Sequence, residues 1–249
     1  MSTLSAGFLL IDKPTGPTSH DVVDVVRRRL GRKIKVGHAG TLDPLASGLL
    51  ILGVGAATKQ LSQLIKLDKT YLFTVRLGAS SATDDAEGPI TVNPNVKILM
   101  PNEVEYCLQS FLGAQNQIPP VFSAKKQGGV PLYKKARLGE RVFPEPQRVT
   151  IYSLELKRYS FPELDLAVTC SSGTYVRALA RDIGRALHTG GYVTNLRRTA
   201  VGPFRIEDSH SLDETLSLGP DSLLTPVADT LRFLVSGSNA LTDDTTVLS

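Results

Sequence analysis

Residues 35–48 (KVGHAGTLDPLASG) concentrate the side chains best suited to chemistry. They place His38 and Asp43 five residues apart and hold three glycines within twelve residues, which allows unusual backbone angles and the close approach of a ligand. A carboxylate in such a loop can act as a nucleophile or as a general base. Two simpler interpretations stay open at this point. The pair Asp43–Pro44 is also typical of a helix N-cap followed by proline, and His38 could be an ordinary core or loop histidine.

A second informative stretch is SGTYVRALARDIG at residues 172–184, which is expected to open a helix directly after a strand. Arg177 would lie in the first turn, where the helix dipole disfavours a cation. It is therefore either a surface arginine or the partner of a buried carboxylate that it keeps ionised. Tyr71 begins a strand and belongs either to the core or to a site. Residues 53–59 (GVGAATK) lack both the Gly-Lys-Ser/Thr of a phosphate loop and the third glycine of a dinucleotide fingerprint, which argues against nucleotide hydrolysis.

The elements that must position these residues are predicted from hydrophobic periodicity, caps and turn residues. Strands are expected at residues 7–12, 49–52, 71–77, 149–159, 164–171 and 192–198. Helices are expected at residues 18–30, 58–67, 102–112, 132–138 and 174–188, the first capped by Thr18 or Ser19 and the third by Asn102. Residues 35–48 are expected to be irregular. Strands and helices do not alternate strictly, so we predict an α+β fold with a mixed, largely antiparallel sheet.

Charge is unevenly distributed along the 249 residues. After residue 206 a single basic residue stands against eight acidic ones, a net charge of −7, whereas residues 1–205 carry +11. The basic excess gathers in five clusters, at residues 27–29, 32–35, 125–126, 134–137 and 197–198. One such cluster is usually a solvated face, but several within one domain favour a polyanionic partner such as nucleic acid.

Composition excludes several classes of protein. A hydrophobic fraction of 41% allows a sizeable core, so global disorder is excluded. Two cysteines, Cys107 and Cys170, are too few for a disulfide framework or a cysteine-rich metal site. No apolar run is long enough to span a bilayer, and no secretory signal is recognisable, so we expect a cytoplasmic protein.

Five collinear motifs carry a resemblance to a known family: FLLIDKPTGPTSHDVV, GHAGTLDPLASGLL, KTYLFTVRLG, QIPPVFSAKKQGGVPLYKKAR and GTYVRALARDIG. Together they resemble the TruB family of tRNA pseudouridine synthases over residues 7 to about 205. The resemblance implies the pseudouridine synthase fold and the isomerisation of uridine 55 in the T arm of tRNA. It also implies that neither a cofactor nor a metal takes part.

The resemblance further implies roles for three catalytic residues. Asp43 matches the family's catalytic aspartate, which acts on the sugar either as a nucleophile or as a base. Tyr71 matches the tyrosine that stacks on the target uracil. Arg177 matches the arginine paired with the catalytic carboxylate.

Four further positions match substrate-binding residues of the family. His38 matches the histidine that fills the space left by the extruded base. Asp85 matches an acidic residue of the active-site polar network. Tyr175 and Leu196 match positions that line the uracil pocket.

The expected organisation is a catalytic domain at residues 1–205 and a short acidic segment at 206–249. Residues 121–148 would form a basic insertion that closes over the RNA, and the small C-terminal RNA-binding domain of the PUA type would be incomplete or absent. The expected partner is tRNA, bound by a monomer with no membrane and no obligate protein partner. Two alternatives stay open: a guide-RNA-dependent relative that modifies ribosomal RNA, and an RNA-binding or RNA-folding protein without catalysis.

Overall fold

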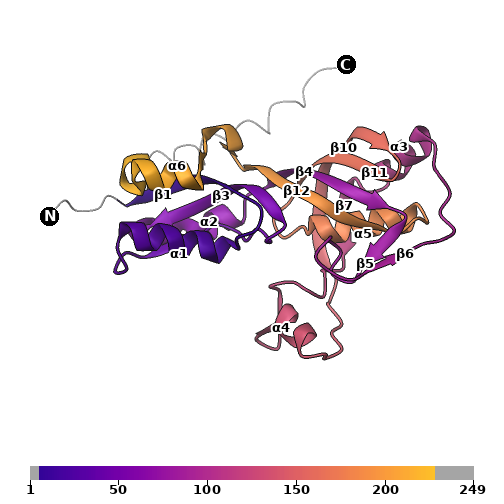
Figure 1. Cartoon of the computed structure of the whole chain (residues 1–249), viewed down its shortest axis with the longest axis horizontal. Helices are drawn as coiled ribbons and strands as arrows, with labels where there is room; N and C mark the ends of the chain where they lie inside the picture. Colours follow the sequence, from indigo (N-terminus) through magenta and orange to yellow (C-terminus); the bar gives the residue numbers. More distant parts are fainter. Residues whose placement is uncertain (1–5, 228–249) are drawn as a thin grey trace, which may run out of the picture. The chain divides into compact units, whose positions relative to one another are not determined.

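The computed structural model describes residues 6–227, and the chain divides into two compact units (Figure 1). The first unit comprises the residues up to Lys69 together with those from Arg197 onward. The second comprises residues 70–196. Strand β12 (Gly191–Val201) contributes its first part to the second unit and its last part to the first.

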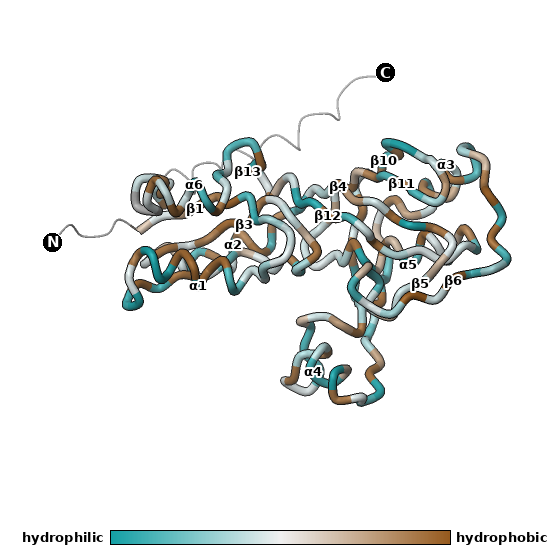
Figure 2. The backbone as a smooth tube through the Cα atoms, in the orientation of Figure 1, coloured by the Kyte–Doolittle hydropathy of each residue, from teal (hydrophilic) through white to brown (hydrophobic). Residues whose placement is uncertain are grey.

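The first unit is built on the antiparallel pair β1 (Gly7–Lys13) and β3 (Ala46–Val54), which run in unbroken register from Gly7 opposite Val54 to Lys13 opposite Gly48. The short strand β2 (Val36–His38) also pairs with β3. Nearly every residue of β3 is buried, and its tube is largely brown in Figure 2, as a continuous apolar strand should be. The core of this unit therefore lies along the strand that follows the Asp43 loop.

Helix α1 (Ser19–Leu30) begins where the sequence predicts. Thr18 caps it through a capping box with Asp21, and Val22, Val23 and Val26 form its buried face. The predicted helix at residues 58–67 is instead a 3₁₀ helix η1 (Gly55–Gln60) followed by the short helix α2 (Leu61–Ile65).

The described part of the acidic segment is folded onto β1. It forms η2 (Ile206–Asp208), β14 (His210–Ser211), α6 (Leu212–Leu218), η3 (Pro220–Leu223) and β15 (Thr225–Pro226), after the short strand β13 (Phe204–Arg205). Strand β14 pairs with β1 in parallel and β15 pairs with it antiparallel. Residues 228–249, with the rest of the predicted acidic segment, lie outside the described residues.

In the second unit the sheet has the order β12–β4–β11–β10–β7. Its strands are β4 (Lys69–Leu77), β7 (Gly113–Gln117), β10 (Gln147–Ser160) and β11 (Glu163–Cys170). Strand β4 buries every second residue, as its alternating sequence predicts. A hairpin of β5 (Ala79–Ser81) and β6 (Ile90–Val92) and the helices α3 (Pro101–Gln109) and α5 (Val176–Ala186) complete the body of this unit. The mixed sheet with helices confirms the predicted α+β fold.

Residues 118–146 form an insertion between β7 and β10. It contains β8 (Lys126–Gln127), β9 (Val130–Pro131) and α4 (Leu132–Arg137), and it projects from the rest of the second unit in Figure 1. The predicted short helix at residues 132–138 is thereby confirmed. No helix among residues 6–227 is both long enough and apolar enough to cross a membrane.

Two other local predictions are wrong, and one strand was not predicted. Residues 36–38 are a strand and not part of an irregular loop. Helix α3 begins at Pro101 with Met100 as its N-cap, because the Glu103 carboxylate accepts a hydrogen bond from the Met100 N–H at 2.7 Å, so Asn102 is not the cap. Residues 113–117 form β7, which local sequence does not indicate because GAQNQ has no apolar alternation.

The packing of α5 against the turn before β12 generates a stability prediction. An added Cβ at Gly184 would lie 2.3 Å from the Gly191 nitrogen and 2.4 Å from the Gly190 carbonyl carbon. Helix propensity alone favours Gly184→Ala by about 1 kcal/mol, whereas forcing two backbones apart costs about 1–3 kcal/mol. We expect the net effect to be destabilising, measured as a lower urea midpoint.

The control for this prediction is Ala186→Gly, at an exposed position of the same helix. It measures the propensity effect without a steric clash. A Gly184→Ala protein as stable as the parent, or more stable, would contradict the close approach of the two segments.

Candidate active site

The Asp43 loop joins β2 to β3 and is anchored through its main chain. The Ala39 N–H donates to Ile51 O at 2.8 Å, and Asp43 O accepts from the Ala46 N–H at 3.0 Å. Pro44 O accepts a hydrogen bond of 2.8 Å from the Gly16 N–H, which ties the loop to the turn after β1. No helix follows Pro44, so the N-cap interpretation of Asp43–Pro44 is wrong. Asp43 is half-buried in a fixed turn that leads into the most buried strand of the unit.

A serine from α1 holds the centre of the same loop. The Ser19 hydroxyl accepts from the Leu42 N–H at 2.8 Å and donates to Leu42 O at 3.0 Å. Both groups are buried, and satisfying them removes the penalty for burying polar atoms in an irregular segment. The first helical residue and the residue before Asp43 are thus held together.

His38 ends β2, and its Nδ1 is buried with no hydrogen-bond partner among the described residues. Burial lowers the pKa of His38 below its usual value, and the Arg198 charge lowers it further, while a main-chain hydrogen bond with Gly40 opposes them. The histidine is thus not the satisfied loop residue of the simpler interpretation. His38 lies five residues before Asp43, and its Nδ1 is available as a hydrogen-bond donor or acceptor.

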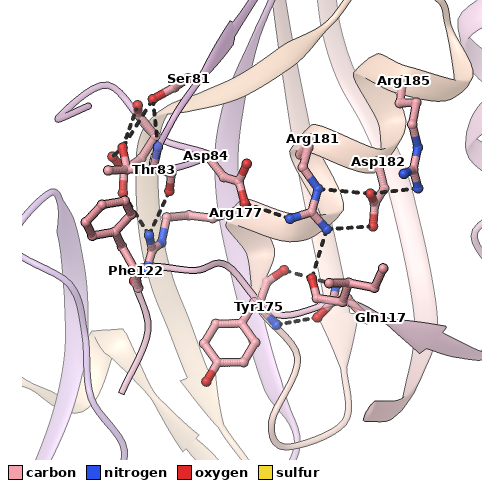
Figure 3. A network of polar contacts seen from close by, with 12 residues as sticks. Ser81, Thr83, Asp84, Gln117, Phe122, Tyr175, Arg177, Arg181, Asp182 and Arg185 are labelled. Carbon is pink, nitrogen blue, oxygen red and sulfur yellow. Dashed lines mark hydrogen bonds and ion pairs between the residues drawn. The ribbon is translucent and has the colours of Figure 1, made fainter. Parts of the chain in front are cut away.

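In the second unit, Arg177 is a buried cation and not a surface arginine. Its Nη1 lies 3.2 Å from a carboxylate oxygen of Asp85, and the two side chains are only 6% and 3% exposed. The same guanidinium donates to Thr83 O at 2.8 Å and to Phe122 O at 3.0 Å (Figure 3). A buried ion pair is stable only when its remaining donors are also satisfied, and here two main-chain carbonyls do that.

Asp85 is fixed independently of Arg177. Its other carboxylate oxygen accepts hydrogen bonds from the Thr83 hydroxyl and from the Glu87 N–H. An isolated bridge pairs Asp85 with Val193 at the start of β12. The structure therefore brings together two of the residues expected in the site, Asp85 and Arg177, in a rigid buried network.

A second network on α5 was not predicted. Arg181 donates to the Asp84 carboxylate at 2.8 Å and to Ile118 O at 2.8 Å, and it also pairs with Asp182 (Figure 3). Burial raises the pKa of Asp84, and the charges of Arg181 and Arg177 act against that rise. The network ties the loop before Asp85 to the first residues of the insertion.

Tyr175 and Leu196, expected to line a uracil pocket, both lie in the second unit. Tyr175 is the N-cap residue of α5, and the Gln117 side-chain amide accepts from its N–H at 2.8 Å and donates to its carbonyl at 3.1 Å. Leu196 and Tyr71 are both buried, at 6% and 8% exposure.

The expected catalytic residues are divided between the two units. Asp43 and His38 belong to the first, and Tyr71 and Arg177 belong to the second. The pairing of Arg177 with Asp43 accordingly stays a prediction. Within residues 6–227, no group of three or more His, Cys, Asp or Glu side chains is arranged to hold a metal ion.

One predicted basic cluster, residues 197–198, is not a free cationic surface. Arg197 pairs with Asp12 through contacts of 2.7 and 2.9 Å, and Arg198 is 1% exposed. The sequence signal for this difference is the period-2 alternation of a strand, because adjacent residues of β12 point to opposite faces of the sheet.

Comparison with solved structures supports the fold. A crystal structure of a Cbf5–Nop10–Gar1 complex aligns with 85% of this chain at a TM-score of 0.66 and 28% identity. A structure of an H/ACA RNP bound to a substrate RNA containing 2′-deoxyuridine aligns with 85% at a TM-score of 0.63 and 25% identity. The chain spans about half the length of those solved chains, 54% and 52%.

Family models and similar proteins show the family to which the chain belongs. Residues 27–176 match the model described as TruB family pseudouridylate synthase (N terminal domain), and residues 177–220 match the tRNA pseudouridylate synthase B C-terminal domain. The tRNA pseudouridine synthase B of Cutibacterium acnes is 48% identical over 208 residues, covering 82% of this chain and 70% of the relative. That of Opitutus terrae is 45% identical over 207 residues, covering 83% and 86%. The chain belongs to the TruB family of pseudouridylate synthases, which confirms the resemblance drawn from its motifs.

The Arg177–Asp85 pair predicts the effect of Asp85→Asn. The substitution leaves a buried guanidinium without its opposite charge, which costs about 3 kcal/mol of unfolding free energy. Urea denaturation at neutral pH measures the loss. The control is Asp24→Asn, which breaks an exposed pair with Arg27 and should cost less than about 1 kcal/mol. Equal effects of the two substitutions would contradict the buried pair.

The lowered pKa of His38 predicts a pH dependence of stability. In the unfolded chain a histidine has a pKa of about 6.5, so below that pH the unfolded state binds more protons. The stability associated with neutral His38 is fully present above about pH 6.5 and is lost as the pH falls through the lowered pKa. We expect His38→Asn to reduce the loss of unfolding free energy on acidification from pH 7 to pH 5. Identical slopes in the parent and in His38→Asn would rule out a buried neutral His38.

Proposed function

We propose that this protein isomerises uridine 55 in the T arm of tRNA to pseudouridine, with Asp43 as the catalytic residue. The observation that carries the proposal is the family match across residues 27–176, which contains Asp43 in a loop anchored on both sides by main-chain hydrogen bonds. The relatives named tRNA pseudouridine synthase B, 45% and 48% identical, support tRNA as the substrate.

The reaction defines what the site must do. The bond between C1′ of the ribose and N1 of uracil breaks, the base rotates, and a bond between C1′ and C5 forms. The C5 proton is released and N1 gains a proton, so atoms balance with no change of oxidation state. Asp43 acts on the sugar, as a nucleophile at C1′ or as a base, and its half-buried position suits either role.

Two residues of the second unit complete the proposed site. Arg177 neutralises charge at the reacting centre, and its guanidinium is already oriented by Asp85, Thr83 O and Phe122 O. Tyr71 stacks on the flipped uracil, where base–aromatic stacking contributes about 1–3 kcal/mol. That stacking and the phosphate contacts offset the few kcal/mol needed to extrude the base.

The insertion at residues 118–146 supplies an RNA-binding surface in this proposal. Lys126, Lys134 and Arg137 are exposed on it, and the Arg137 guanidinium lies 5.6 Å from the centre of the Tyr133 ring. Cations beside an aromatic ring suit a nucleic acid that offers both phosphates and bases. Such a protein would work in the cytoplasm as a monomer, with tRNA as its partner.

A guide-RNA-dependent activity is the competing proposal, because the solved complexes that share the fold include an H/ACA RNP. Sequence identity favours the tRNA enzyme, at 45–48% for the tRNA pseudouridine synthase B relatives against 25–28% for the H/ACA structures. A catalytically silent RNA-folding protein is disfavoured by the presence of Asp43, Tyr71 and Arg177 together.

The test is release of tritium from unmodified tRNA labelled at C5 of uridine. Wild-type protein alone should release one tritium per tRNA, and Asp43→Asn should lower the rate by at least about a thousandfold, because the amide can neither attack nor remove a proton. Binding of tRNA, measured by filter retention, should stay within about twofold.

Asp208→Asn, an exposed carboxylate of η2, is the matched control and should keep the parent rate. Turnover by Asp43→Asn at the wild-type rate would refute the assignment of the catalytic residue. Release that requires an added guide RNA would support the competing activity.

A further inference from the structure

Arg198 on β12 is among the largest side chains that are fully buried in this protein, at 1% exposure. Burying a guanidinium removes it from water at a penalty of several kcal/mol, so its donors must be satisfied inside the protein. Within residues 6–227 it has no carboxylate partner. A cation this deep that is paired only with neutral groups calls for an explanation.

Its partners are main-chain carbonyls. The Nε donates to Leu49 O at 2.8 Å, which fixes the start of the guanidinium plane against β3. One terminal nitrogen lies 3.2 Å from Gly40 O and the other 3.5 Å from Thr41 O. Two of the three carbonyls therefore belong to the Asp43 loop, two and three residues before the carboxylate.

The backbone that carries Arg198 packs directly against β3 at Gly48. A Cβ added at Gly48 would lie 2.3 Å from Arg198 O and 2.8 Å from Arg198 N, so the two strands are in direct backbone contact there. Gly48 has a φ of +102°, which only glycine adopts readily. The guanidinium thus projects from a fixed point toward the loop.

Arg198 contacts the part of the Asp43 loop that lies between the loop's other anchors. The other anchors hold Ala39, Leu42, Asp43 and Pro44. The carbonyls of Gly40 and Thr41 fall between them, where Gly40 has a φ of +93°. His38 also makes a main-chain hydrogen bond with Gly40, and Arg198 is the side chain that contacts both of these peptide groups.

We propose that Arg198 is a positioning residue that fixes the Gly40–Thr41 peptide groups and, through them, the direction of the Asp43 carboxylate. The inference rests on the proposed function of Asp43. A misplacement of about 1 Å at a reacting group can reduce the rate a hundredfold. The planar fork of arginine can reach separate carbonyls at once, whereas a lysine ammonium is a point charge.

The experiment compares Arg198→Lys with Arg197→Lys. Arg197 is the adjacent residue, is half-exposed and pairs with Asp12, so it controls for the loss of a guanidinium on the same strand. We expect Arg198→Lys to lower the single-turnover rate at saturating enzyme at least tenfold with the dissociation constant for tRNA within twofold of the parent. Arg197→Lys should stay within about twofold in rate.

Hydrogen exchange distinguishes a local effect on the loop from a general loss of stability of the first unit. In Arg198→Lys, amides 40–43 should exchange at least tenfold faster while those of β3 keep the parent rates. Arg198→Gln, which removes the charge, is a second variant with the same expectation and serves if the lysine protein does not fold.

The outcomes that would overturn the positioning role differ from the outcome that would refute the proposed function. An unchanged single-turnover rate in Arg198→Lys, or faster exchange spread over the whole first unit, would overturn the positioning role. A wild-type protein that forms no pseudouridine would instead refute the proposed function, and the exchange of amides 40–43 would still report whether Arg198 fixes the loop.

Discussion

Buried cations held by main-chain carbonyls are the constraint on which the site depends. The Lys13 ammonium donates to Pro14 O at 2.8 Å and to Pro17 O at 2.7 Å, although the side chain is fully buried. Arg177 and Arg198 donate in the same way to carbonyls of Thr83 and Gly40. Irregular segments leave carbonyls without strand or helix partners, and a buried cation needs acceptors, so each requirement satisfies the other.

The same constraint explains how main-chain groups of irregular segments are held in place beside the sheet. The carboxylates of the proposed site lie on irregular segments beside these cations, and His38 ends the short strand β2 next to one of them. His38 and Asp43 flank the carbonyls that Arg198 binds, and Asp85 lies two residues after the carbonyl that Arg177 binds. A reacting group on a loop can be oriented well only if the loop's peptide groups are fixed, and here charge–dipole contacts fix them.

Local sequence features predict the regular elements well and the cation contacts poorly. The Thr18–Asp21 capping box, the alternation of β4 and the paired strands β10 and β11 follow from residue types within a few positions. The three-residue strand β2 is too short for a period to be recognised, and the polar β7 has no apolar face to give one.

The site residues divide in the same way. Motifs identified Asp43, Asp85 and Arg177, and the buried environment of Arg177 was one of the two readings that its residue type left open. The sequence neighbours Arg197 and Arg198 look alike as a basic pair, yet one lies at the surface and the other in the core. The alternation of β12 places the two side chains on opposite faces, but the burial of Arg198 depends on Gly40 and Leu49, roughly 150 residues away.

The insertion at residues 118–146 is attached to the second unit in an unusual way. The residues at its two ends, Gln117 and Gln147, each bind a main-chain group just before α5, at Tyr175 and Gly173. Both attachment points lie on one short stretch of chain, so the two ends of the insertion are held close together. The free-energy cost of closing such a loop rises only slowly with the number of residues in it. Changes in the length of this segment should therefore alter the stability of the rest of the second unit only slightly, and α5 keeps its contacts with Gln117 and Gln147 whatever lies between them.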